Sequence, residues 1–199
     1  MSEEKLTRAA IVTGGSRGIG RAVCVALAKQ GCNVVVNYCH GAEPAEQTAA
    51  LCRAEGAQAV TVQADVSTAE GCKALFDAAA AAFGRGDVLV NNAGFGISGA
   101  IEFTETAEAK ALFDVNFFGM VNMNRAVVPL MRQAGRGRIV NLSSVAAPVP
   151  IPFQAYYSAT KAAVNAYTMA LANELRPFGV TVCAVMPGDI HTGFTAARR

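Results

Sequence analysis

The stretch from Ala9 to Gly20 reads AAIVTGGSRGIG, a short apolar run that leads into a glycine-rich turn. After this turn, apolar residues recur at the spacing of one helix face as far as Gly31, and the run Val34-Val35-Val36 follows. Periodic apolar residues between two apolar runs, with glycines at the breaks, indicate a strand, a turn, a helix and a second strand. We therefore predict that a βαβ unit opens the protein.

Two kinds of phosphate-binding loop compete for the glycine turn. A nucleoside-triphosphate P-loop requires Lys and then Ser or Thr after its second glycine, whereas Arg21 and Ala22 follow Gly20. A dinucleotide site requires glycines where the backbone approaches a pyrophosphate at a helix N-terminus. Gly14, Gly18 and Gly20 suit that role, although their G-x-x-x-G-x-G spacing departs from G-x-G-x-x-G. We predict dinucleotide binding, with an ordinary glycine turn as the alternative.

The end of the second strand indicates which dinucleotide is bound. An NAD site places Asp or Glu there to bond the ribose 2′-hydroxyl, whereas this strand runs out through Asn37, Tyr38, Cys39 and His40. Without an acid, a 2′-phosphate meets no repulsion, and Arg17 offers it a guanidinium. We predict that NADP(H) is preferred over NAD(H), the alternative being that Arg17 is only a solvated loop cation.

Strands and helices continue to alternate along the chain. We expect helices over about 43–54, to near 83, over 106–132 and to near 176, and strands over 57–63, 88–90, 138–142 and 180–186. Ser67 and Glu70 have the spacing of a capping box for the second of these helices. Largely apolar strands alternating with helices predict an α/β fold, a parallel sheet covered on both faces, with ligands at the carboxyl ends of the strands.

A tyrosine and a lysine stand four positions apart near residue 160. In a helix, Tyr157 and Lys161 lie on one face, one turn apart. A fixed cation stabilises a phenolate and lowers the pKa of the phenol from about 10, so Tyr157 can act as an acid near neutral pH. Tyr156 has Thr160 four positions later, and not a cation. A Tyr-x-x-x-Lys pair also occurs by chance, so its meaning depends on the motifs around it.

Length and composition restrict the class of protein. The 199 residues are 52% hydrophobic with a formal net charge of +2, which fits one globular domain over 1–199 and no nucleic-acid partner. The first seven residues lack the apolar core of a signal peptide, and no apolar stretch reaches the roughly 18 residues that span a bilayer. We expect a cytoplasmic protein that does not bind membranes. The six cysteines form no C-x-x-C pair, so we expect buried thiols and no metal.

Seven segments, taken together and in order over residues 8–193, resemble the short-chain dehydrogenase/reductase family. They are Thr13 to Gly20, Asp65-Val66, Asn91-Asn92-Ala93-Gly94, Asn116, Ser144, Tyr157-x-x-x-Lys161 and Pro187-Gly188-x-x-x-Thr192. The resemblance implies a doubly wound parallel sheet, the Rossmann fold. The family's last strand is absent here, because its members usually continue tens of residues further. We expect either a truncated chain or a pocket that another subunit completes.

The resemblance also implies the chemistry. Tyr157 is the general acid/base, and Lys161 bonds the nicotinamide ribose and lowers the pKa of Tyr157. Ser144, thirteen residues before Tyr157, bonds the same substrate oxygen, and its neighbour Ser143 is structural. Asn116 holds a water in a proton relay to Lys161, with a hydrogen-bonded core amide as the alternative.

Cofactor contacts are implied along most of the chain. The glycine turn takes the pyrophosphate, Asp65 the adenine amine, and Asn91 a ribose through its backbone, while the segment after Pro187 holds the nicotinamide end. The complete set is Gly14, Ser16, Arg17, Gly18, Ile19, Gly20, Asn37, Asp65, Val66, Asn91, Ala93, Gly94, Tyr157, Lys161, Pro187, Gly188, Ile190 and Thr192.

The expected activity is the interconversion of a small-molecule carbonyl and an alcohol with NADP(H). The alternative is a cofactor-binding module without turnover, because the C-terminal wall of the substrate pocket is missing. An apolar substrate, such as a fatty acyl, steroid-like or sphingoid-type molecule, is suggested by apolar loop residues expected near the mouth: Phe95, Ile97, Val149, Ile151, Phe153 and Phe194. Ordinary loop packing explains them equally well. We also expect a homodimer or homotetramer formed through the alanine-rich helix that carries Tyr157 and the long helix before it.

Overall fold

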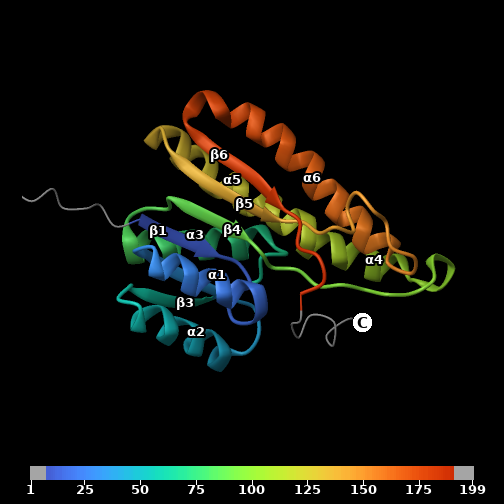
Figure 1. Ribbon diagram of the computed structural model, residues 1–199, viewed down its shortest axis with the longest axis horizontal. Coiled ribbons are helices and arrows are strands. Elements are labelled where there is room, and N and C mark those ends of the chain that lie inside the picture. The colour runs from blue at the N-terminus through green and yellow to red at the C-terminus, as the bar shows by residue number, and fades with distance from the viewer. Residues whose placement is uncertain (1–7, 191–199) are drawn as a thin grey trace, which may run out of the picture.

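The computed structural model describes residues 8–190, which form a six-stranded parallel sheet with helices between the strands (Figure 1). The strands are β1 (Arg8–Val12), β2 (Cys32–Tyr38), β3 (Ala59–Gln63), β4 (Val88–Asn91), β5 (Gly137–Leu142) and β6 (Val180–Val185). The main helices are α1 (Gly18–Lys29), α2 (Ala42–Ala54), α3 (Ala69–Phe83), α4 (Thr106–Phe113), α5 (Gly119–Ala134) and α6 (Ala155–Leu175). Shorter helical turns are η1 (Ile101–Phe103), η2 (Asp114–Phe118) and η3 (Arg176–Phe178).

The strand order β3-β2-β1-β4-β5-β6 confirms the predicted doubly wound sheet. Val12 pairs with Val36 of β2 on one side and with Val90 of β4 on the other. From β1 the chain adds β2 and β3 on one side of the sheet, and it then adds β4, β5 and β6 on the other side. The direction of winding therefore reverses between β1 and β4. Ligands of such sheets bind at the carboxyl ends of the strands beside this reversal.

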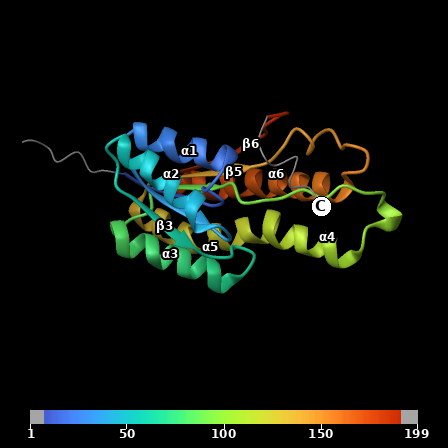
Figure 2. The same cartoon turned by 90° about the horizontal axis from the view of Figure 1, so that it is seen from below.

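The strands are apolar throughout because both of their faces are buried. Ile11, Val35 and Leu89 pack in one core with α3, α5 and α6. Their neighbours Val12, Val36 and Val90 pack in a second core with α1 and α2. Figure 2 shows α1 and α2 on the opposite side of the sheet from α3 and α5. Continuous valine and isoleucine runs therefore replace the polar alternation of a half-exposed strand.

The coverage is uneven at the β6 edge. Val180 and Val182 of β6 belong to the core beneath α6, whereas Thr181, Cys183 and Val185 point to the other face and are exposed. Among residues 8–190, helices therefore cover both faces of the sheet from β3 to β4 but only one face of β6.

The structure corrects two local predictions. The expected helix over 106–132 is helical throughout, but its residues Asp114–Phe118 form η2, a π-helical turn, in which the amide of Asn116 bonds the backbone of Phe95. Such turns recur at functional sites. The cap of α3 is Thr68 and not Ser67, since the Thr68 hydroxyl accepts a hydrogen bond from Gly71 N at 3.0 Å. None of the helices described is both long and apolar enough to cross a bilayer.

Candidate active site

The glycine turn between β1 and α1 places an uncapped helix N-terminus at the carboxyl edge of the sheet. No side chain caps α1, and its first turn holds no acidic residue. Gly14 and Gly18 have positive φ, which a side chain would strain. A Cβ on Gly20 would stand 2.2 Å from the carbonyl oxygen of Gly14. Free N–H groups on a turn this tight fit the pyrophosphate of a dinucleotide.

Two predicted residues beside this turn differ in what they can reach. Arg17 is exposed, and its Nη2 lies 3.7 Å from where a Cβ of Gly41 would stand, so it lies over the end of β2. Asn37 is buried, and its side chain bonds Gly14 N at 3.2 Å and the carbonyl oxygen of Ala64 at 3.0 Å. Asn37 thus holds the turn in place, and its predicted contact with the cofactor would be indirect.

The segment after β4 is tied to the glycine turn by Thr13 and Asn92, which lie in predicted motifs but were given no role of their own. The Thr13 hydroxyl accepts hydrogen bonds from the N–H groups of Asn92, at 2.9 Å, and Ala93, at 3.0 Å. The Asn92 amide donates in turn to the carbonyl oxygens of Thr13 and Gly14. The motifs of two strands far apart in sequence are therefore fixed against each other.

Helix α6 brings the tyrosine and the lysine to the sheet. The residues Tyr157, Lys161, Val164, Thr168, Leu171 and Leu175 recur every three or four positions and are all buried. This stripe faces β6 and the core, so Tyr157 and Lys161 are held together at its N-terminal end. The Lys161 Nζ lies 5.8 Å from the centroid of the Tyr157 ring. The predicted pairing of the two side chains on one helix face is present.

Lys161 is buried and bonds the end of β5. Its Nζ donates to the carbonyl oxygen of Leu142 at 2.7 Å, and burial lowers its pKa from 10.5 to about 8. The ammonium is therefore the main form at pH 7. One of its three N–H donors is used by Leu142, which leaves two for other acceptors.

The two serines after β5 have different partners. The Ser143 hydroxyl donates to the carbonyl oxygen of Lys161 at 3.1 Å and joins β5 to α6, which agrees with its predicted structural role. The Ser144 oxygen accepts from Ala146 N at 3.1 Å, so its own proton is available to another acceptor. The N–H of the following residue, Val145, bonds the carbonyl oxygen of Pro187, which places that predicted cofactor segment beside Ser144.

Three of the four hydrogen-bonding positions of the Asn116 amide have protein partners. Its Oδ1 accepts from Phe95 N at 3.0 Å, and its Nδ2 donates to Phe95 O at 2.9 Å and to the Thr160 hydroxyl at 3.3 Å. The side chain is thus a hydrogen-bonded core amide, the alternative noted above. A Cβ on Gly94 would stand 3.0 Å from Asn116 Oδ1 and 3.8 Å from Lys161 Nζ, so a side chain there would crowd both groups.

The role of Thr160 was missed because the sequence analysis considered this residue only as the non-cation four positions after Tyr156. It is completely buried, and its hydroxyl donates to the Tyr157 carbonyl oxygen at 2.7 Å while accepting from Asn116. It is the link between the π-helical turn and the tyrosine helix.

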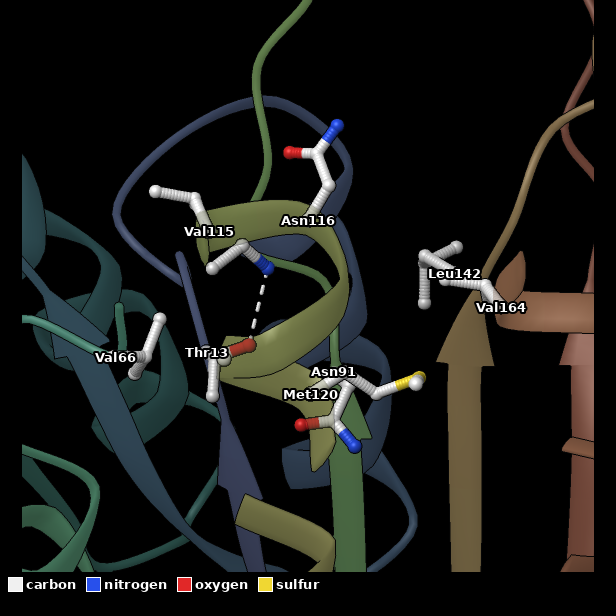
Figure 3. A pocket seen from close by; sticks show the side chains of 10 residues that line it. Thr13, Val66, Asn91, Val115, Asn116, Met120, Leu142 and Val164 are labelled. Carbon is white, nitrogen blue, oxygen red and sulfur yellow. Dashed lines mark hydrogen bonds between the residues drawn. The ribbon is translucent and has the colours of Figure 1, made fainter. Parts of the chain in front are cut away.

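Residues from several predicted site segments line one small cavity (Figure 3). Its volume of about 10 Å³ has room for one water molecule. The Asn91 amide donates to Asn124 and Asn141, and its buried Oδ1 has no protein partner. The lining residues are Thr13, Val66, Asn91, Ala93, Val115, Asn116, Gly119, Met120, Leu142 and Val164.

The remaining predicted site residues differ in their exposure to solvent. Asp65 is exposed at the carboxyl edge and accepts from Ser67 N, and Val66 beside it is buried. Ser16 is buried, Ile19 is half-buried, and Gly188 and Ile190 are exposed after β6. Thr192 and Phe194 lie outside the described residues. All six cysteines are free thiols, and between residues 8 and 190 no group of three His, Cys, Asp or Glu side chains could hold a metal.

Comparison with known proteins agrees with this arrangement. The family model described as short chain dehydrogenase matches residues 8–199. The chain is 40% identical over 188 residues to a 3-ketodihydrosphingosine reductase of Bacteroides thetaiotaomicron, covering 94% of this chain and 66% of that protein. It is 41% identical to a 3-oxoacyl-[acyl-carrier-protein] reductase of Staphylococcus aureus, covering 97% and 78%.

A solved structure gives the same result for the fold. A metagenomic short-chain oxidoreductase in complex with NADP superposes with a TM-score of 0.87 at 37% identity, covering 92% of this chain and 83% of that one. The chain therefore spans about two thirds to four fifths of the length of these proteins.

Proposed function

Because this chain belongs to the short-chain dehydrogenase family, we propose that it interconverts a carbonyl and an alcohol with NADP(H), using Tyr157 as the general acid/base. The observation that supports this best is the buried pair on α6, with Lys161 Nζ 5.8 Å from the Tyr157 ring at the carboxyl edge of the sheet. A cofactor-binding module without turnover would not need a phenol held beside an ammonium.

The cofactor, when bound, supplies the hydride, and this chain's residues supply position and the proton. In the reducing direction, the Tyr157 hydroxyl gives its proton to the substrate oxygen as negative charge develops there. The Ser144 hydroxyl donates a hydrogen bond to the same oxygen. In the oxidising direction, the Tyr157 oxygen takes the proton of the alcohol.

Asn116 acts in this scheme by position. Its amide fixes the segment after β4 to α6, and Gly94 leaves the space in front of Lys161 Nζ open. The Asn116 side chain has three protein hydrogen bonds, which leaves one acceptor position on Oδ1 for the water of the predicted relay to Lys161. Arg17 and the lack of an acid after β2 support NADP(H) over NAD(H), whereas the uncapped N-terminus of α1 fits the pyrophosphate of either cofactor.

The assembly and the location are also proposals. Phe118 and Leu130 are exposed on η2 and α5, where a second copy would cover them, and this favours a homodimer or homotetramer. A monomer by sedimentation at micromolar concentration would contradict it. The cytoplasmic location stays a prediction of the sequence.

The activity is tested by mixing the protein with NADPH and a panel of ketones while nicotinamide absorbance is followed. We expect NADPH oxidation with at least one ketone, and slower oxidation of NADH. Binding of NADPH without oxidation by any ketone would favour the module instead.

The cofactor preference has its own variant. Arg17→Gln should reduce the NADPH-to-NADH ratio of kcat/KM about tenfold, since one charge-assisted bond to a phosphate contributes about 1.4 kcal/mol or more. Arg125→Gln removes an equal charge from the exposed side of α5 and should leave the ratio unchanged.

A further inference from the structure

Two loops beside the tyrosine expose an unusual number of large apolar side chains. In η1, Ile101 is 64% exposed and Phe103 81%. In the loop before α6, Val149 is 67% exposed and Phe153 68%, with Ile151 also exposed. We call these five residues the apolar rim. Clustered apolar surface of this kind marks a binding site for apolar groups.

The two loops that carry the rim are linked to each other and to Tyr157. The loops are joined by a hydrogen bond from Gly99 N to the carbonyl oxygen of Phe153 at 2.9 Å. Beneath them, Ile97 and Ala146, one from each loop, pack in a single buried cluster with Leu112 and Tyr157. An apolar group bound on the rim would therefore lie on the same loops that pack against Tyr157.

The backbone holds the rim at a conformational cost. Phe153 has φ of 63° and is the non-glycine residue with positive φ among those described. Backbone strain of this kind persists where the surrounding structure imposes it, often at ligand sites. Here it presents an exposed ring that has no visible role in the fold.

The charge around the rim is one-sided. Residues 94–105 and 145–154 contain Glu102 and Glu105 but no lysine or arginine, and both carboxylates are exposed. Farther along, Glu108 is also exposed, beside one cation, Lys110. A ligand that carries phosphate or carboxylate groups would be repelled here, whereas an ammonium would be attracted.

We propose that the substrate is a long-chain ketone or alcohol with a neutral or amine-bearing head, whose alkyl chain lies on the apolar rim. This inference rests on the proposed function, since it names the substrate of the same site. The carboxylates of Glu102 and Glu105 beside the apolar rim select against acyl chains that are presented by a phosphate-bearing or acidic carrier.

Chain length is tested with NADPH and the 2-alkanones of four, six, eight and ten carbons. We expect kcat/KM to rise about two- to fourfold per added methylene. Phe103→Ser should lower the ten-to-four-carbon ratio about tenfold. Met169→Ser, which changes an equally exposed residue on the far half of α6, should leave that ratio within twofold. A flat dependence on chain length would overturn the inference while the reductase activity stands.

Head charge is tested by saturation-transfer NMR with decylamine, decanol and decanoate below their micellar concentrations. We expect binding in the order amine, alcohol, carboxylate, with the difference shrinking at high salt. The double variant Glu102→Gln/Glu105→Gln should reduce the amine-to-carboxylate ratio about fivefold, and Glu174→Gln should not. Equal or preferred binding of decanoate would overturn the inference. If no ketone is reduced at all, the proposed function fails, and this order of binding decides the inference alone.

Discussion

Charged side chains have different surroundings at the amino and carboxyl ends of the strands, which form two opposite edges of the sheet. At the amino edge, Asp87 lies between Arg85, with two contacts of 2.6 Å, and Arg136, at 3.9 Å, and it also accepts from Ala9 N. At the carboxyl edge, Lys161 is buried, and between residues 8 and 190 it forms no salt bridge.

The pKa values follow this difference. Burial alone would raise the pKa of Asp87, but the hydrogen bonds and charges of its partners hold it below the ordinary value. Burial lowers the pKa of Lys161 to about 8, and no acid opposes the shift. A paired charge stabilises the fold, whereas a buried charge without a counter-ion costs stability and is typical of a functional site. Substitutions at the two edges should therefore have opposite consequences.

The largest effect should come from Lys161→Met. In the proposed function the ammonium stabilises the phenolate and contacts the ribose, so its removal should lower kcat/KM about 10²–10⁴-fold. Steady-state NADPH oxidation measures it, with circular dichroism as the control for folding. A loss of kcat/KM under tenfold in a folded sample would mean that catalysis does not depend on the charge of Lys161.

The same variant should change how stability depends on pH. Between about pH 8 and the ordinary pKa of 10.5, the unfolded chain holds a proton on Lys161 that the folded chain has lost. Wild-type stability therefore rises with pH in this window, and it should gain on the order of 3 kcal/mol relative to Lys161→Met between pH 7 and pH 11. Urea unfolding at several pH values measures the difference. Parallel curves would show that the folded and unfolded pKa values are the same.

At the amino edge, Asp87→Asn should reduce the free energy of unfolding by about 1–3 kcal/mol and leave the kcat of the folded protein within twofold. The stabilising contribution of Asp87 should be lost as the pH falls through its lowered pKa. Asp77→Asn is the matched control, because Asp77 pairs with Lys73 in an exposed i,i+4 bridge and should change stability by under about 0.5 kcal/mol. Equal losses of stability from the two substitutions would show that the partly buried ion pair of Asp87 contributes no more than the exposed ion pair of Asp77.

The smallest effect should come from Thr160→Val, which keeps the shape and removes the hydroxyl that joins Asn116 to the tyrosine helix. We expect kcat to fall about fivefold, the cost of one buried hydrogen bond of about 1 kcal/mol, with little change in the KM for NADPH. Thr160→Ser should restore kcat. A proportional change in kcat and in the KM for NADPH, or a kcat that Thr160→Ser does not restore, would mean that Thr160 contributes only to packing.

Much of this arrangement was predictable from the sequence. The apolar runs gave the strands, the glycine spacing gave the turn, and the i,i+4 spacing placed Tyr157 and Lys161 on one face. The π-helical turn was not predictable, because apolar residues continue at helical spacing through Asn116 and hide the change in hydrogen bonding. The inward direction of the Asn37 amide depends on Ala64, a partner 27 residues away, which periodicity cannot reveal.

The most direct test of the account compares two neighbouring phenols on α6. Tyr156 is half-buried and Tyr157 is buried beside Lys161, so the two variants Tyr156→Phe and Tyr157→Phe remove the same hydroxyl one residue apart. With NADPH binding confirmed for both, we predict that Tyr157→Phe lowers kcat about 10²–10⁴-fold and that Tyr156→Phe lowers it less than about threefold. Undiminished turnover by Tyr157→Phe would contradict the assignment of the proton donor.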